Sequence, residues 1–175
     1  VMLAARKDRD VVSAAAYDFL MYSGYVSMAY MWAGIKIYIV SACWAGVTLL
    51  VPLLEAGMGV TTDVVLKFFQ RFILTLILIL IFEIRDLKYD DYRLKTVPQS
   101  IGISATKNLI YLLSILFYVL DFFKTGSYPW QGLVNALLIG LMVALTYYVT
   151  PNRSKYYTLF YAESVPVIWY ALIVL

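Results

Sequence analysis

Long apolar stretches alternate with short polar breaks along this chain. A helix rises about 1.5 Å per residue, so a membrane span needs about 20 mostly apolar residues to cross the hydrocarbon. The pattern predicts about six spans, at residues 12–33, 37–55, 62–83, 105–123, 129–150 and 157–175. The first contains Asp18 and several small polar residues, which leaves a tilted, incomplete or protein-buried helix as an alternative. The predicted fold class is all-α, a polytopic transmembrane helical bundle that forms a single domain over residues 1–175.

One polar break is much longer than the others and sets the predicted orientation. Residues 84–104 form a connection that carries Arg85, Lys88, Arg93 and Lys95. The turn at 56–61 has no Lys or Arg. Because positively charged loops stay in the cytoplasm, we expect residues 84–104 on the cytoplasmic side and the turn at 56–61 on the opposite side. The basic residues before position 10 do not fit this scheme.

Composition excludes several classes of protein. Hydrophobic residues make up 63% of the chain and charged residues 14%, with a mean hydropathy of +0.80, whereas about a quarter of a soluble domain is charged. The net charge of +3 is not gathered in a basic stripe, so we expect membrane lipids and no nucleic acid as partners. The chain has no histidine, which excludes His-based zinc sites and Ser-His-Asp triads.

The densest cluster of charges follows the third predicted span. If that helix continues past the membrane surface, Glu83, Asp86 and Asp90 fall on one face, at positions i, i+3 and i+7. Like charges repel, and a divalent cation with oxygen ligands such as Mg²⁺ relieves the repulsion. These three residues are therefore candidate Mg²⁺ ligands, and the nearby cations Lys88, Arg93 and Lys95 are candidates for binding phosphate oxygens. By spacing alone, a solvated loop whose charges do nothing else is equally favoured.

The segment from Asp86 to Asp90, followed by Lys95-Thr96-Val97-Pro98 and Gly102, resembles the second aspartate-rich motif of the UbiA superfamily of intramembrane prenyltransferases. That motif has an Asp where this chain has Glu83, and a basic residue is common where this chain has Asp91. The resemblance extends more loosely over most of the chain, because one span precedes the motif directly and three short-looped spans follow it.

This resemblance implies a function. In the family, two acidic motifs face each other across a cavity and hold an isoprenyl diphosphate through Mg²⁺. It therefore implies transfer of a polyprenyl group from an isoprenyl diphosphate to a lipophilic acceptor, with Asp86, Asp90 and Lys95 as catalytic residues. The first motif has no counterpart here, so we expect the chain to be the C-terminal part of a roughly nine-helix domain and inactive by itself.

Two other functions remain open. A non-catalytic membrane scaffold or a transporter subunit would need only a solvated acidic loop, although the sequence shows no internal repeat of the kind that transporters contain. A CDP-alcohol phosphotransferase also uses membrane carboxylates, but its Asp-Gly-x-x-Ala-Arg signature is absent. In the last predicted span, Glu163 is expected to face the bundle interior, because a charge is costly in hydrocarbon.

Overall fold

The computed structural model describes residues 34–91, 94–125, 130–154 and 156–174, and every regular element in this part of the chain is a helix. The first described helix, Gly34–Glu55, includes the π-helical turn η1 (Gly46–Leu50) and α2 (Val51–Glu55). It is followed by α3 (Thr62–Asp86), α4 (Val97–Ile101), α5 (Ile103–Val119), the 3₁₀ turn η3 (Leu120–Phe123), α6 (Gln131–Tyr148), the π-helical turn η4 (Tyr157–Ala162) and α7 (Glu163–Val174).

Four of the described helices are long and apolar enough to cross a membrane: Gly34–Glu55, Thr62–Asp86, Ile103–Phe123 and Gln131–Tyr148. They correspond to the second, third, fourth and fifth predicted spans. The first predicted span, 12–33, lies outside the described residues. The sixth, 157–175, is covered by η4 and α7, which are not among the four. The structure therefore shows a helical chain with four candidate membrane spans, and the count of about six stays a prediction.

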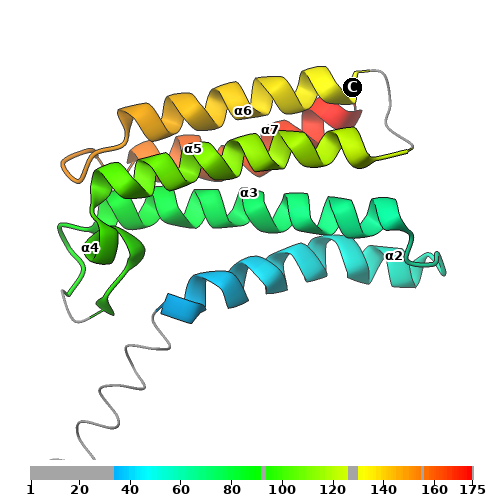
Figure 1. Cartoon of the computed structure of the whole chain (residues 1–175), viewed down its shortest axis with the longest axis horizontal. Coiled ribbons are helices and arrows are strands. Elements are labelled where there is room, and N and C mark those ends of the chain that lie inside the picture. Colours follow the sequence, from blue (N-terminus) through cyan, green and yellow to red (C-terminus); the bar gives the residue numbers. More distant parts are fainter. Residues whose placement is uncertain (1–33, 92–93, 126–129, 155, 175) are drawn as a thin grey trace, which may run out of the picture.

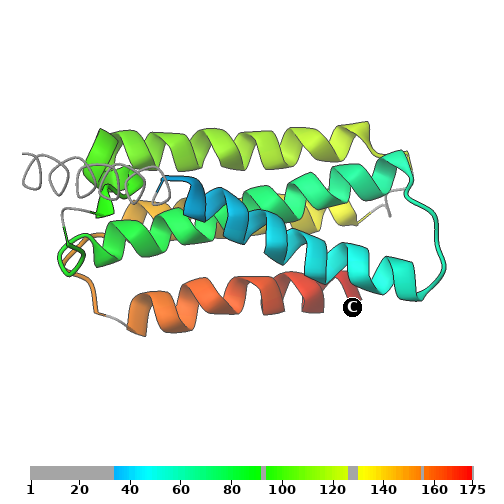
Figure 2. The ribbon, with the colours of Figure 1, turned by 90° about the horizontal axis from the view of Figure 1, so that it is seen from below.

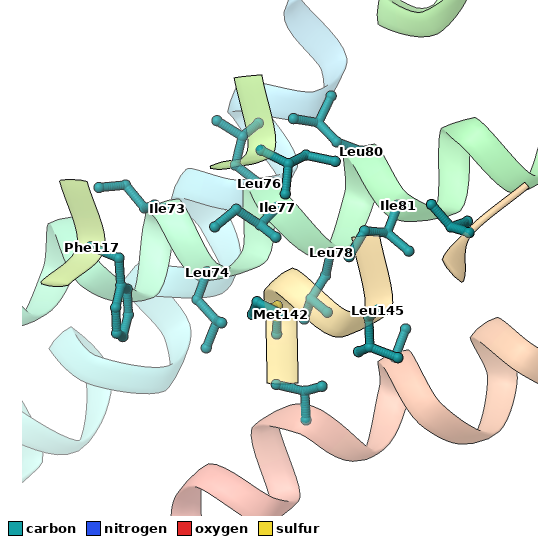
Figure 3. Close-up of a cluster of buried hydrophobic side chains, with 14 of the residues drawn as sticks. Ile73, Leu74, Leu76, Ile77, Leu78, Leu80, Ile81, Phe117, Met142 and Leu145 are labelled. Atoms are coloured by element: carbon teal, nitrogen blue, oxygen red, sulfur yellow. The ribbon is translucent and has the colours of Figure 1, made fainter. Parts of the chain in front are cut away.

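Helix α3 lies at the centre of the arrangement, with the helix Gly34–Glu55 on one side and α5, α6 and α7 on the other (Figures 1 and 2). Its side chains Ile77, Leu80 and Ile81 are almost completely buried. Figure 3 shows Leu78 of α3 close to Met142 of α6 within the same buried cluster. Burial on several sides fixes α3 in position, so residues at its end have a rigid support.

The connections gather at the two ends of the bundle. The segment that contains α4 and the connection between α6 and η4 lie at one end of α3, and the turn between α2 and α3 lies at the other (Figure 1). The predicted separation of residues 84–104 from residues 56–61 agrees with this arrangement. Which end faces the cytoplasm stays a prediction.

The last helix differs from the sequence expectation. Glu163 is the first residue of α7, and it is exposed in the part of the chain that the structure describes. The prediction that it faces the bundle interior is therefore wrong. The chain changes here from the π-helical turn η4 to α7, and Pro166 lies inside α7. Proline has no N–H for the carbonyl four residues earlier, that of Ala162, and this interrupts the regular helical bonding where η4 ends.

Candidate functional site

The acidic residues extend from the end of α3. Asp86 is the last residue of the helix, and its carbonyl accepts hydrogen bonds from the backbone N–H groups of Tyr89 at 2.7 Å and Asp90 at 3.0 Å. The chain therefore makes a further helical turn, which keeps Asp90 above Asp86. The residues just before, Ile84 and Arg85, are buried and hold this end of α3 against the bundle.

A pocket of about 320 Å³ opens between α3 and the helix Gly34–Glu55, and we name it the acidic cleft. It is lined by Lys36, Ile37 and Val40 of the first helix, Ile79, Phe82, Glu83 and Asp86 of α3, and Asp90, Leu94 and Thr96 of the connection that follows. All three carboxylates predicted from the sequence thus line one cleft. They occupy the end nearest the polar connection, whereas most of the residues further along both helices are apolar.

Each carboxylate of the acidic cleft has a different environment. Asp86 is paired with Arg85, whose Nη2 atom lies 2.7 Å from Oδ1 and 3.0 Å from Oδ2. Glu83 accepts a hydrogen bond through Oε2 from the backbone N–H of Val97, at 3.2 Å, and so connects α3 to the start of α4. Partial burial and then the negative charge of Asp86 raise the pKa of Asp90, against the opposing effects of Lys36 and Arg85.

The arrangement limits how a metal ion could be held. Among the residues that the structure describes, no group of three or more acidic side chains is compact enough to bind one ion. Mg²⁺ at phosphate sites commonly takes only one or two carboxylates and completes its coordination with water and phosphate oxygens. Asp86 and Asp90, one helical turn apart, fit this smaller set. Because Glu83 is engaged by Val97, its role as a third ligand stays a prediction.

The basic residues predicted to bind phosphate are placed differently from the acidic ones. Lys88 and Lys95 are exposed and are not among the residues that line the acidic cleft. Lys95 has a left-handed backbone with φ of 43°, and its carbonyl accepts a hydrogen bond from the hydroxyl of Ser100 at 3.3 Å. Arg93 lies outside the described residues. The roles of these three cations in binding diphosphate stay predictions.

The structure adds two cations to the site that sequence reasoning did not select. Lys36 reaches the acidic cleft from the first helix, although about 50 residues separate it from the acidic motif. In the sequence, Lys36 stands out as the one basic residue next to the predicted span 37–55. Arg85 is buried beside Asp86, and its Nε atom has no hydrogen-bond partner among the described residues. Both bring positive charge to carboxylates that would otherwise repel each other.

No family model matches the chain, and no curated protein or solved structure shows significant similarity to it.

Proposed function

We propose that this chain forms one half of the diphosphate site of a UbiA-type intramembrane prenyltransferase, which transfers a polyprenyl group to a lipid-soluble acceptor. The observation that carries the proposal is the division of the acidic cleft into a charged end and an apolar wall. Asp86, Asp90 and Lys36 stand at the charged end, and Ile79 and Val40 belong to the wall. An isoprenyl diphosphate has the same division, between a charged head and a hydrocarbon tail.

The charged residues of the cleft have complementary tasks. Asp86 and Asp90 would hold Mg²⁺, which when bound neutralises negative charge on the diphosphate leaving group. Lys36 would approach phosphate oxygens from the opposite helix as a compact positive charge. Arg85 keeps the Asp86 carboxylate in place through the two contacts of its Nη2 atom.

The apolar part of the cleft would protect the reacting carbon. Loss of diphosphate from an allylic substrate leaves a carbocation, which water would capture. Phe82 lies next to Glu83 in the lining and offers an aromatic ring, which can stabilise a nearby cation by roughly 0.5–2 kcal/mol. Ile37, Val40 and Ile79 keep the adjoining surface free of polar groups that would attract water.

One acidic motif is half of the arrangement that the resemblance implies. We therefore expect the isolated chain to bind diphosphate with Mg²⁺ but not to cleave it, because positioned charges on both sides normally supply the largest part of such a rate enhancement. Turnover is expected only together with a second acidic motif.

Binding of an unreactive substrate analogue tests this proposal. The probe is farnesyl thiodiphosphate with Mg²⁺, titrated calorimetrically into the purified chain in lipid nanodiscs. Asp86→Asn and Asp90→Asn should each weaken binding about tenfold or more, because each removes one candidate metal ligand. Asp91→Asn is the matched control, since Asp91 is exposed and does not line the acidic cleft. Equal effects at all three positions would contradict the proposal.

A second pair of variants tests which lysine binds the diphosphate. Lys36→Met should weaken binding of the same analogue about threefold to tenfold, because Lys36 lines the acidic cleft. Lys88→Met is its control, because Lys88 is exposed outside the cleft. If Lys88→Met has the larger effect, the diphosphate lies against the connection after α3 and not in the cleft.

One observation favours the second candidate, a non-catalytic membrane scaffold. Two of the three carboxylates already have partners within the protein, Asp86 with Arg85 and Glu83 with Val97. These contacts would suffice to fold the connection onto α3 without any ligand. Failure of the wild-type chain to bind either the analogue or Mg²⁺ with inorganic diphosphate would favour the scaffold.

A further inference from the structure

A second cavity lies along the groove between the helix Gly34–Glu55 and α3, at a different depth. It has a volume of about 360 Å³ and is lined by Trp44, Thr48, Arg71, Leu74, Thr75, Leu78, Pro166 and Trp169. We name it the Arg71 cavity. Arg71 and Asp86 are separated by about 22 Å along α3, at about 1.5 Å per residue, so this cavity is separate from the acidic cleft.

Arg71 is a charge placed within a candidate membrane span. It lies about 14 Å along the helix from Thr62, well inside the apolar part of α3. An arginine near the middle of a bilayer costs at least about 2.5 kcal/mol, so such residues usually have a specific partner. The guanidinium of Arg71 donates a hydrogen bond to the carbonyl of Thr48. No ion pair of Arg71 with a carboxylate is found among the described residues.

The polar groups around Arg71 leave it as the main hydrogen-bond donor of the cavity. A guanidinium has five N–H donors, and the Thr48 carbonyl takes one nitrogen. The hydroxyl of Thr48 donates to the carbonyl of Trp44 at 2.8 Å, and that of Thr75 donates to the carbonyl of Arg71 at 2.9 Å. Both hydroxyl donors are therefore already used. A ligand that satisfies this site must bring acceptor oxygens.

The rest of the lining is apolar, and one wall is held rigidly. The indole N–H of Trp169 donates to Oδ1 of Asn135 at 3.3 Å, and its ring packs edge-on against Phe117 with centroids 6.1 Å apart. These two contacts fix the orientation of the ring before any ligand arrives. Trp44 forms the opposite wall and is 57% exposed, so the cavity is accessible beside the first helix.

We propose that the Arg71 cavity binds an amphiphilic acid, whose carboxylate or phosphate oxygens pair with Arg71 and whose apolar body lies against Trp44 and Trp169. The planar fork of a guanidinium matches two oxygens of such a head. The depth of Arg71 favours a single-chain carboxylic acid over a phospholipid. A carboxylic acid can enter hydrocarbon in its neutral form and lose its proton beside the arginine, whereas a phospholipid headgroup stays at the interface. This site does not depend on prenyl transfer.

Quenching of tryptophan fluorescence by brominated lipids tests the proposal directly, because two tryptophans line the cavity. The full chain is placed in phosphatidylcholine nanodiscs in variants that keep Trp44, Trp169 or Trp130 as the only tryptophan. Trp130 precedes α6, outside the cavity, and serves as the control. Dibromostearic acid should quench Trp44 and Trp169 in a saturable way and should quench Trp130 only in proportion to its concentration in the lipid.

Two comparisons identify what the cavity recognises. Arg71→Leu should weaken the saturable quenching by the acid about tenfold or more, and Arg71→Lys should weaken it less. On the protein that retains Arg71, the methyl ester of dibromostearic acid should bind as weakly as the acid binds to the Arg71→Leu variant. Circular dichroism and gel filtration check that the variants fold. If Arg71→Leu does not fold, the acid and its ester still give the decisive comparison on the protein that retains Arg71.

The outcomes separate the possible sources of the acid. Saturable quenching by dibromostearic acid identifies a free acid, and saturable quenching by brominated phosphatidylglycerol identifies a membrane lipid; both support recognition of an acidic head by Arg71. Equal quenching by acid and ester overturns the proposal, and so does quenching unchanged by Arg71→Leu. A loss of diphosphate binding in the acidic cleft leaves these results unaffected.

Discussion

Glu83 accepts a hydrogen bond from the backbone N–H of Val97 at 3.2 Å, so replacing it should release the start of α4 from α3. A hydrogen bond to a charged acceptor contributes about 1.5–3 kcal/mol, and this bond is only partly buried, which favours the lower end of that range. Glu83→Leu removes the acceptor. Glu83→Gln keeps a neutral acceptor of similar shape and should lose about 1 kcal/mol or less.

The amide of Val97 itself reports the change. A loss of about 1.5–2 kcal/mol in local stability should accelerate its hydrogen exchange about 10- to 30-fold in Glu83→Leu. In Glu83→Gln the acceleration should be about fivefold or less. Exchange measured by mass spectrometry on short overlapping peptides resolves this amide, because the following residue, Pro98, has no N–H of its own.

A matched binding measurement separates anchoring from metal ligation. Asp86→Asn should leave the exchange of Val97 within about twofold of wild type but weaken binding of Mg²⁺ with farnesyl thiodiphosphate about tenfold. Glu83→Gln should instead accelerate the exchange of Val97 and leave the affinity for the analogue within about threefold of wild type. If Glu83→Leu leaves Val97 unchanged while Glu83→Gln lowers affinity as far as Asp86→Asn, Glu83 is a metal ligand and the anchoring argument is wrong.

Two further predictions concern topology and stability. Single cysteines at positions 61 and 95 are introduced into a Cys43→Ser protein, which removes the native cysteine. They should react with an impermeant maleimide from opposite sides of sealed vesicles. Reaction of both from the same side would refute the predicted orientation. The buried ion pair of Lys124 with Asp121, 2.7 Å apart, should make Asp121→Leu cost about 3–5 kcal/mol, because it strands the buried ammonium. Replacing both Asp121 and Lys124 by Leu should lower the free energy of unfolding, measured with denaturant, by less than half as much as Asp121→Leu alone. Equal losses in the single and the double variant would show that the pairing does not matter.

Hydropathy along the chain was enough to predict where the long apolar helices lie. The predicted spans 37–55 and 62–83 lie within the helices Gly34–Glu55 and Thr62–Asp86, because the length and hydropathy of an apolar run are local properties. The sequence also placed Glu83, Asp86 and Asp90 on one side of the chain, since helical periodicity alone brings positions i, i+3 and i+7 together.

Which groups face these residues depends on the packing of the helices against one another. Lys36 enters the acidic cleft, whereas Lys88, much nearer in sequence, points outside it. Arg71 meets the carbonyl of Thr48, which belongs to the neighbouring helix, and the same packing brings Trp169 of α7 into its cavity. Such contacts depend on how helices cross and rotate against each other, which the packing of many side chains decides together. Hydropathy along one segment records that a face is apolar but not which other helix will cover it.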